Sequence, residues 1–171
     1  RIGDKIILIS SFANTPNVPL ATSDVQKAEV LSTIKELDIM AEKLTKIQLP
    51  NGEVISYYAL KQKENHEALL KQGKILQLGF LHTEPNWYPW YWGYFFGGRL
   101  WNGKDTIIAD EFKNVLAYDW VRSYSVKYGV DNIKKFSSSF GVFSSPQNAF
   151  LSSKVAMVSD GVWLNNFIEK Y

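Results

Sequence analysis

The sequence predicts an α/β fold with a small central sheet flanked by helices. Short apolar runs typical of buried strands alternate with longer segments in which apolar residues recur at helical spacing. The run Lys74–Leu81 is nearly continuous in apolar residues, so we interpret it as a central strand. This run and a second one, Val155–Val158, each lead through a turn into a helix, which is the usual connection of an α/β protein.

Length and composition limit the class of protein. A chain of 171 residues can form one compact domain, and we expect residues 1–171 to form a single α/β unit. The absence of cysteine excludes disulfides, thiolate nucleophiles and cysteine zinc sites. A net charge of +2, with lysines scattered among acids, argues against a nucleic-acid partner. We predict no catalytic residue, no metal site and no cofactor.

The apolar blocks and the first residue of the sequence bear on membrane insertion and export. The longest aliphatic block, Ile6–Ile9, is far too short to span a membrane. Residue 1 is Arg instead of Met, and we find no signal peptide, so we expect the chain to be a piece of a larger protein.

The first 60 residues predict a strand and two helices before a turn. Lys5–Ile9 has the pattern of a short buried strand, and a helix is expected from Ser23 or Asp24 to Leu31. Thr33 and Glu36 form a capping box that predicts the start of a second helix. Its apolar face comprises Ile34, Leu37, Met40, Ala41, Leu44 and Ile47. Pro50-Asn51-Gly52 ends it, and Val54–Tyr58 is interpreted as a short strand.

Two histidines lie around the central strand. A polar helix is expected over Gln62–Lys71, ending at Gly73, and it carries His66. With no other His or Cys nearby, His66 is interpreted as a surface residue and not as a metal ligand. His82 follows the central strand, and we interpret it as a hydrogen-bonded loop residue because no nucleophile motif accompanies it.

The last 75 residues predict a hairpin, helices and a strand. Asn102-Gly103 indicates a tight hairpin within Arg99–Ile108. A long helix is expected from an Asp110 cap to Gly129, with Trp120 in the core. The apolar face of this helix is predicted to comprise Phe112, Val115, Leu116, Trp120, Tyr124 and Tyr128. Shorter helices are expected from Asp131, with Ile133 and Phe136, and from Ser145-Pro146, with Ala149 and Phe150 facing inward.

The segment Glu84–Gly98 is unusually aromatic. Eight of its fifteen residues are aromatic, and three are Trp. Such a run cannot place all its rings on one side of a helix, so some must face a ligand or solvent. Tyr94, Phe95 and Phe96 precede a Gly97-Gly98 helix stop and are interpreted as core residues. Trp87 and Trp90 lie at a strand-to-helix junction and are interpreted as a binding platform.

A second junction follows the strand Val155–Val158. Ser159-Asp160-Gly161 turns into a helix expected from Val162, so the Gly161 amide would lie at its amino terminus. Trp163 would lie in the first turn and point beyond the strand. If the two strands are parallel in one sheet, both junctions open on the same edge and converge on one cleft.

The order of these motifs resembles that of one family. The motifs are the capped helix over 33–46, then Leu78-Gly79-Phe80, Trp92–Gly98, Ala117–Trp120, Lys127-Tyr128-Gly129, Asn148-Ala149-Phe150, Lys154–Met157 and Asp160–Trp163. Together they resemble the extracellular solute-binding proteins, family 1, of bacterial sugar ABC importers, the maltose-binding-protein-like group, over residues 33–171. Residues 1–30 match the family poorly, and Ser153 stands where a Gly is usual.

The resemblance implies a two-lobed clamp of the type II periplasmic-binding-protein-like kind, of which this chain is similar to the second lobe. It implies an oligosaccharide ligand, a first lobe outside this chain and ABC permease subunits as partners. It also implies an extracytoplasmic location, either periplasmic or lipid-anchored at the outer face of the membrane. The ring expected to stack on sugar is Trp163, with the segment from Glu84 to Trp90 supplying the opposite wall.

A sugar site needs rings and hydrogen-bonding groups. We expect Trp163, Trp87 and Trp90 to stack on a pyranose, with Glu84, Asn86, Asp160 and the Gly161 amide at its hydroxyl rim. One alternative is a glycoside hydrolase with Glu84 and Asp160 as the carboxylate pair. Another is a free-standing carbohydrate-binding or peptide-binding module. The density of Trp and Tyr favours binding over catalysis, so we do not expect an enzyme.

Overall fold

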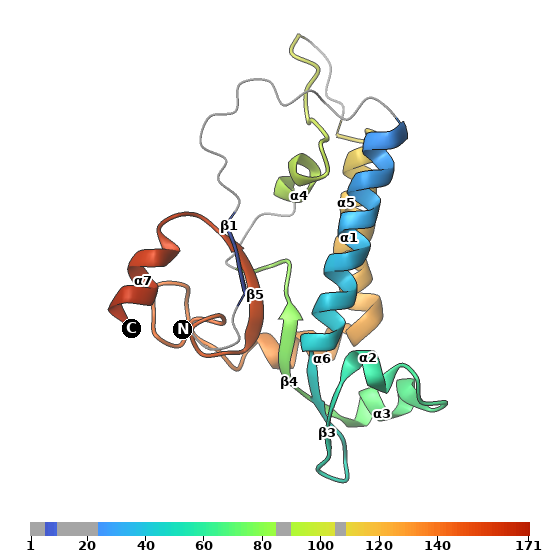
Figure 1. Ribbon diagram of the computed structural model, residues 1–171, viewed down its shortest axis with the longest axis vertical. Coiled ribbons are helices and arrows are strands. Elements are labelled where there is room, and N and C mark those ends of the chain that lie inside the picture. Colours follow the sequence, from blue (N-terminus) through green and yellow to red (C-terminus); the bar gives the residue numbers. More distant parts are fainter. Residues whose placement is uncertain (1–5, 10–23, 85–89, 105–108) are drawn as a thin grey trace.

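The computed structural model describes residues 6–9, 24–84, 90–104 and 109–171, and it confirms a mixed α/β fold with a small sheet flanked by helices (Figure 1). The strands are β1 (Ile6–Ile9), β2 (Lys46–Gln48), β3 (Val54–Ser56), β4 (Lys74–Phe80) and β5 (Val155–Asp160). The helices are α1 (Asp24–Leu44), α2 (Tyr57–Leu60), α3 (His66–Gln72), α4 (Trp90–Phe95), α5 (Phe112–Tyr128), α6 (Val130–Ser137) and α7 (Leu164–Lys170).

The sheet has a parallel half and an antiparallel half. Its order is β1-β5-β4-β2-β3, in which β1, β5 and β4 are parallel while β2 runs antiparallel to both β4 and β3. Met157 of β5 pairs with Ile6 on one side and with Phe80 on the other. The predicted strand Lys74–Leu81 is therefore central, as expected. Because β4 and β5 are parallel neighbours, the chain leaves both at the same edge of the sheet.

The two helices expected in the first 45 residues are one continuous helix, α1. Thr33 lies within it, so the prediction that Thr33 and Glu36 form a capping box was wrong. A Ser or Thr followed by Glu begins a helix only where the preceding turn is not itself helical. Here the segment from Asp24 continues at helical spacing into the next one.

Helix α1 ends earlier than its apolar pattern predicts. The Thr45 hydroxyl donates a hydrogen bond of 2.8 Å to the Ala41 carbonyl and accepts one of 2.9 Å from the Gly79 amide of β4. Ile47, predicted as the last residue of the helical face, instead lies fully buried in β2 between Ile55 and Ile75. Thr45 thus links the end of α1 to β4, because its hydroxyl, and not a backbone carbonyl, accepts the hydrogen bond of the Gly79 amide.

Gly79 is the position where α1 and β4 come closest. The space that a Cβ would occupy on Gly79 is filled by the backbone of Ala41. Only glycine allows this approach, and any larger residue would push the helix off the strand. This contact fixes α1 against the centre of the sheet.

Several predicted boundaries change in the middle of the chain. The strand at Val54 ends at Ser56, whose hydroxyl accepts from the Ala59 amide and caps α2. The next helix begins at His66, four residues later than expected. Only part of the predicted hairpin over Arg99–Ile108 can be compared, because residues 105–108 lie outside the described part of the chain.

The long helix α5 begins after Glu111, so the prediction of an Asp110 cap was wrong. Its buried face carries Trp120, Tyr124 and Tyr128, as predicted, whereas Phe112 and Val115 are exposed. The start of α5 is covered on another side, because Asn114 and Ala117 are buried and the Asn114 side chain lies against Gly93 of α4. Phe112 and Val115 fall on the opposite side of the helix, so the predicted apolar face was wrong at these two positions.

The expected helix from Ser145-Pro146 is a series of turns instead. The Asn148 side chain holds these turns together by hydrogen bonds to the backbone. Its oxygen accepts hydrogen bonds from the Phe150 and Leu151 amides, and its nitrogen donates one to the Phe143 carbonyl. Ala149 and Phe150 are buried, as predicted. Ser153 has a left-handed backbone with φ of 61°, at the position where the resembling family usually has Gly.

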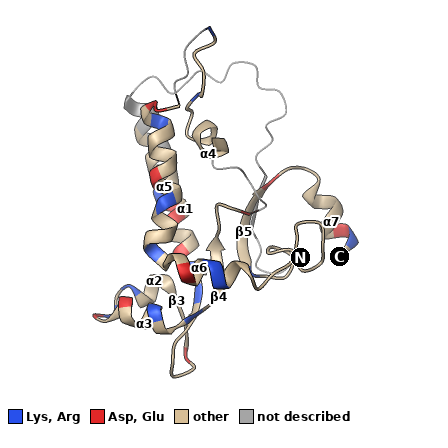
Figure 2. Ribbon diagram, turned by 180° about the vertical axis from the view of Figure 1, so that it is seen from behind, with Lys and Arg blue, Asp and Glu red and all other residues tan. Residues whose placement is uncertain are grey.

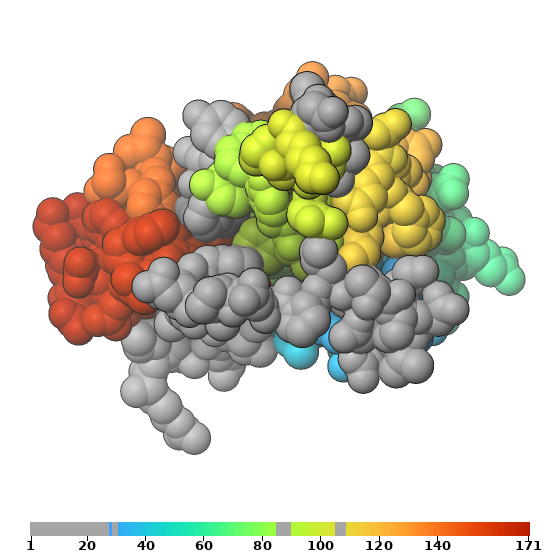
Figure 3. Space-filling model, turned by 90° about the horizontal axis from the view of Figure 1, so that it is seen from above, coloured from blue at the N-terminus to red at the C-terminus, as the bar shows by residue number. Residues whose placement is uncertain are grey.

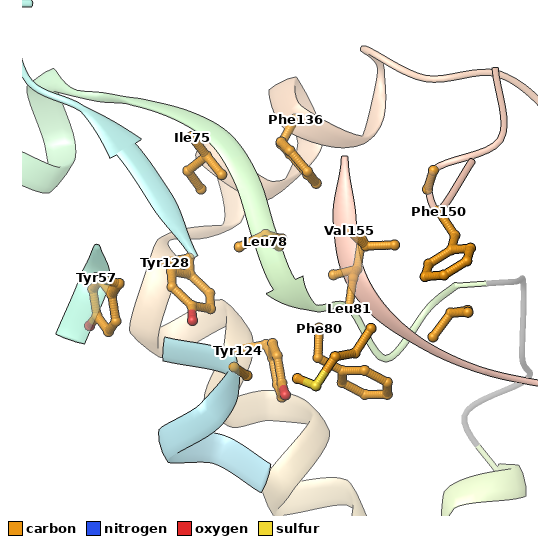
Figure 4. Close-up of a cluster of buried hydrophobic side chains, with 14 of the residues drawn as sticks. Tyr57, Ile75, Leu78, Phe80, Leu81, Tyr124, Tyr128, Phe136, Phe150 and Val155 are labelled. Atoms are coloured by element: carbon orange, nitrogen blue, oxygen red, sulfur yellow. The ribbon is translucent and has the colours of Figure 1, made fainter. Parts of the chain in front are cut away.

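An aromatic core occupies the space between the sheet and the helices α1, α4 and α5. Figure 4 shows Phe80 of β4 beside Tyr124 of α5, with Tyr128 and Tyr57 further along. The ring centroids of Phe80 and Tyr124 are 6.3 Å apart, and those of Tyr57 and Tyr128 are 4.8 Å apart. Among the helices that the structure describes, none is both long and apolar enough for a membrane span.

Candidate functional site

The candidate site lies at the edge of the sheet where β4 and β5 end. Figure 1 shows α4 beyond the end of β4 and α7 beside the end of β5. Figure 3 looks down on this end of the molecule and shows the yellow-green α4 segment between the red carboxyl-terminal segment and the yellow segment of α5. The two junctions predicted from the sequence therefore lie on one side of the molecule.

Helix α4 separates its aromatic residues into buried and exposed sets. Trp92 is buried, and its indole N–H donates a 3.1 Å hydrogen bond to the His82 carbonyl. Phe96 is also buried, but Tyr94 is 46 % exposed, so its assignment to the core was wrong. Position 94 falls on the opposite side of the helix from 92 and 96, which explains the difference.

Trp90 lies on the exposed side of α4. Its side of the helix includes Tyr94, and Trp90 itself is 39 % exposed. The Trp90 indole stacks on Tyr91, with centroids 4.2 Å apart and planes 18° apart, and meets Tyr94 edge-on at 5.9 Å. Tyr91 and Tyr94 thus join Trp90 in an aromatic patch that our sequence interpretation missed. The signal was present, since Trp90 and Tyr94 are spaced by four residues in a helix.

Two predicted site residues cannot be placed. Asn86 and Trp87 belong to residues 85–89, which lie outside the described part of the chain. Their roles at the sugar rim and in the platform stay predictions.

Glu84 and His82 follow β4 on the way to this patch. Burial raises the pKa of Glu84 to about 7, and its backbone amide donates to the Leu81 carbonyl in a turn. Burial lowers the pKa of His82 to about 4, and its ring lies 5.2 Å from that of Tyr124. Because His82 Nδ1 is buried with no partner among the described residues, this side chain is neutral at pH 7 and belongs to the core.

Asp160, Gly161 and Trp163 form one compact unit at the end of β5. The Asp160 residue is 1 % exposed, and its Oδ1 accepts a 2.7 Å hydrogen bond from the Gly161 amide. Burial raises the pKa of Asp160, while the hydrogen bond from the Gly161 amide and the nearby Trp163 side chain act in the opposite direction. Asp160 Oδ2 is buried without a hydrogen-bond partner among the described residues, so the carboxyl group is enclosed at the end of β5.

Gly161 makes this arrangement possible. The benzenoid ring of Trp163 fills the place that a Cβ on Gly161 would take. Trp163 is the N-cap of α7, one position before the first turn in which we expected it, and it is 47 % exposed. One part of the indole lies over Gly161 and the rest is accessible from outside.

The predicted site residues differ in how far they are exposed to solvent. Trp90 and Trp163 are exposed and Glu84 is half-buried, so all three can reach a ligand at this edge. Asp160 is buried, so its carboxyl acts on Trp163 and Gly161 and not directly on a sugar. Within the described part of the chain, no group of three or more His, Asp and Glu residues could hold a metal ion.

Two cavities lie at the other end of the sheet, near the amino end of β4. The first, of about 640 Å³, is lined by Tyr57, Tyr128 and Asn132 among others, and the second, of about 410 Å³, is lined by residues of α3, β4 and α6. Lys71 and Asn132 line both cavities, which are therefore neighbours. The sequence interpretation assigned no site to this end.

Comparisons with models of known protein families, with curated proteins and with solved structures found no match for this chain.

Proposed function

We propose that this chain is the carbohydrate-binding second lobe of an extracytoplasmic solute receptor of an ABC importer. The observation that supports the proposal is the parallel pairing of β4 with β5, which brings two Trp-bearing junctions to one edge of the sheet. Ligands of open α/β sheets bind outside the carboxyl ends of the strands. The exposure of Trp90 and Trp163, which follow β4 and β5 in the chain, supports a role for these rings in such a site.

The chemistry of a sugar suits these groups. A pyranose has apolar C–H faces that stack on indole rings and a rim of hydroxyls that need hydrogen-bonding partners. Trp163 and the Trp90 patch supply rings, and Glu84 supplies a carboxyl group at the rim. Each covered ring contributes about 1 to 3 kcal/mol from the area removed from water.

The proposal includes a second binding wall outside this chain. In a two-lobed clamp, hinge closure covers the ligand from both sides. With one wall only, we expect weak binding, with a Kd of about 1 mM or more. The receptor is proposed to work outside the cytoplasm, in a periplasm or anchored by lipid, and to deliver sugar to ABC permease subunits.

The test compares single Trp substitutions in the 171-residue chain. Binding of neutral oligosaccharides is measured by saturation-transfer difference NMR and by Trp fluorescence, with maltotriose, cellotriose and xylotriose as probes. Trp163→Ala and Trp90→Ala are each expected to weaken binding about tenfold or abolish it. Trp101→Ala is the matched control, because Trp101 is 55 % exposed but belongs to the connection between α4 and α5 and to neither strand-to-helix junction.

Two results would contradict the proposal. Sugar binding that survives both Trp163→Ala and Trp90→Ala would remove these rings from the site. A nanomolar Kd for the chain alone would contradict the need for a second wall.

A glycoside hydrolase is the second candidate, and one observation favours it. A general acid for glycosidic bonds needs a carboxyl group with a raised pKa, and burial raises the pKa of Glu84 to about 7. Asp160, however, is only 1 % exposed and is therefore poorly placed as a nucleophile or base. Aryl glycosides distinguish the candidates: turnover that disappears in Glu84→Gln would establish the enzyme, and we expect no turnover from either protein.

A further inference from the structure

The cavity of about 410 Å³ at the amino end of β4 has a cationic rim. Four lysines from different parts of the chain line it: Lys71 near the end of α3, Lys74 at the start of β4, Lys135 on α6 and Lys154 just before β5. None of the described residues that line it is Asp or Glu. Figure 2 shows blue lysine positions on α6 beside β4 and on the neighbouring α3.

The fold, and not sequence proximity, brings these lysines together. Lys71 and Lys74 flank Gly73, but Lys135 and Lys154 come from segments more distant in the chain. The Leu78 amide donates a 2.9 Å hydrogen bond to the Lys154 carbonyl, so the backbone of Lys154 is tied to β4. The amino ends of β4 and β5 therefore hold two of the four positions in a fixed relation.

Interaction with the carboxyl ends of helices is one structural role of these lysines, but it does not account for all four of their charges. Helices α3 and α6 both end beside this cavity, and a helix carboxyl end carries a partial negative charge of about half a unit. Two such ends offset about one of the four lysine charges. About three positive charges are left around one small cavity, on side chains of which Lys71, Lys74 and Lys135 are exposed, so this part of the surface has a positive potential that attracts anions.

The lysines have no ion-pair partner in the part of the chain that the structure describes. The described ion pairs are Lys61 and Lys127 with Glu42, and Arg122 with Asp119. The buried Glu42 carboxylate is neutralised by two lysines, Lys61 and Lys127. The cavity lysines, of which three are exposed, have no such carboxylate among the described residues and are accessible to an anion from outside.

We propose that this cavity binds an anionic group with several negative oxygens, such as a phosphate or sulfate ester. Among the residues that line the cavity, Ile75 and Phe136 are buried and apolar, whereas Gln72 and three of the lysines are exposed. A ligand that fits places its anionic oxygens on the lysines and a less polar portion against the apolar residues. Two sources present this chemistry, a soluble phosphorylated compound and the headgroup of an anionic lipid.

The site is independent of the proposed sugar site. It lies at the amino end of β4, whereas Trp90 and Trp163 lie beyond the carboxyl ends of β4 and β5. A ligand here would leave the sugar-facing edge accessible. Loss of either function can therefore be measured without loss of the other.

The test uses two probes on the 171-residue chain. Inorganic pyrophosphate binding is measured by calorimetry, and binding to vesicles of phosphatidylglycerol in phosphatidylcholine is measured by flotation. Lys74→Glu with Lys154→Glu is expected to weaken binding by about tenfold or more, and binding should weaken as salt rises. Pyrophosphate binding alone would identify a soluble ligand, and vesicle binding alone would identify a lipid headgroup.

The matched control is Lys35→Glu with Lys63→Glu, which changes net charge equally at exposed positions that line neither described cavity. Binding within about twofold of the starting protein is expected for this control. A neutral pair, Lys71→Gln with Lys135→Gln, tests the site without charge reversal if the Glu pair does not fold. Equal loss in the control pair, or no binding of either probe by the starting protein, would overturn the proposal.

Discussion

Four of the Trp residues that the structure describes occupy two different environments: Trp92 and Trp120 lie in the aromatic core, and Trp90 and Trp163 lie at the strand-end junctions. In the core, Trp120 is 7 % exposed, its indole N–H donates to Asp38 at 3.2 Å, and its centroid lies 4.9 Å from that of Trp92. At the junctions, Trp90 and Trp163 have large exposed areas. The difference teaches that aromatic content alone does not locate a binding surface, because half-buried and fully buried rings serve different purposes.

The largest expected effect separates these two environments by stability. Trp120→Ala should lower the free energy of unfolding by about 3 to 5 kcal/mol, because it opens a cavity and leaves Asp38 without its indole partner. Trp163→Ala should lower it by less than about 1 kcal/mol, since the ring is 47 % exposed. Urea denaturation measures both, and equal losses would show that the junction Trp is a core residue.

The second prediction compares two titrating groups, His82 in the core and Glu84 at the junction. The pKa of His82 is lowered to about 4, so its contribution to stability is present above pH 6.5 and is lost as pH falls toward 4. The pKa of Glu84 is raised to about 7, so the folded state binds the proton more tightly and loses stability as pH rises from about 4.5 to 7.

Single substitutions separate these two dependences of the free energy of unfolding on pH. With allowance for solvent screening at partly exposed groups, each contributes about 1 kcal/mol. Glu84→Gln should remove the loss of stability between pH 4.5 and 7 and keep the loss at acid pH. His82→Gln should do the reverse. Urea titrations from pH 4 to 8 measure both, and unchanged slopes in either variant would contradict the burial assigned to that group.

A third change acts on the junction alone. Gly161→Ala places a methyl group where the Trp163 ring lies, so the indole must move away from residue 161. We expect a loss of about 1 kcal/mol and a shift of the Trp fluorescence spectrum to longer wavelength as the ring becomes more hydrated. Gly103→Ala is a control for the spectrum alone: no described atom lies within 4 Å of its Cβ position, but its φ of 92° makes Ala strained, so it should lose stability without a spectral shift. An unchanged spectrum in Gly161→Ala would mean that Trp163 does not fold over residue 161.

The smallest expected effect lies at the other end of β5. Ser153 has φ of 61°, which glycine adopts with less strain. Ser153→Gly should raise the free energy of unfolding by about 0.5 kcal/mol, since relief of strain is partly offset by the greater freedom of Gly in the unfolded chain. Thermal unfolding measures the change. A loss of stability instead would mean that the turn before β5 depends on the Ser side chain.

The main strands and several core residues could be predicted from the sequence because hydrophobic patterning determines them. The central strand, the burial of Trp120 and Phe150, and the strand before Asp160 all follow from apolar runs. The ends of helices were predicted less well, because contacts distant in sequence decide them. Thr45 ends α1 by bonding to Gly79, a partner that no local pattern shows.

The candidate site was predictable as a place but not in detail. Strand-turn-helix order predicts that Trp163 and Trp90 lie at one edge if the strands are parallel, and β4 and β5 are parallel. The packing of the Trp163 ring against Gly161 depends on a side-chain rotation and a glycine, which sequence spacing does not encode. The lysine cavity was missed for a related reason, since its residues meet only in three dimensions.

The place of Met157 has a consequence for how the chain acquires its structure. Its strand hydrogen-bonds to the earliest strand on one side and to a mid-chain strand on the other, so the sheet cannot close until residues 155–160 have been synthesised. Contacts so distant in sequence slow folding and leave strand edges unsatisfied in the meantime. Nascent chains that stop short of residue 155 should therefore depend on chaperones and aggregate when released from the ribosome.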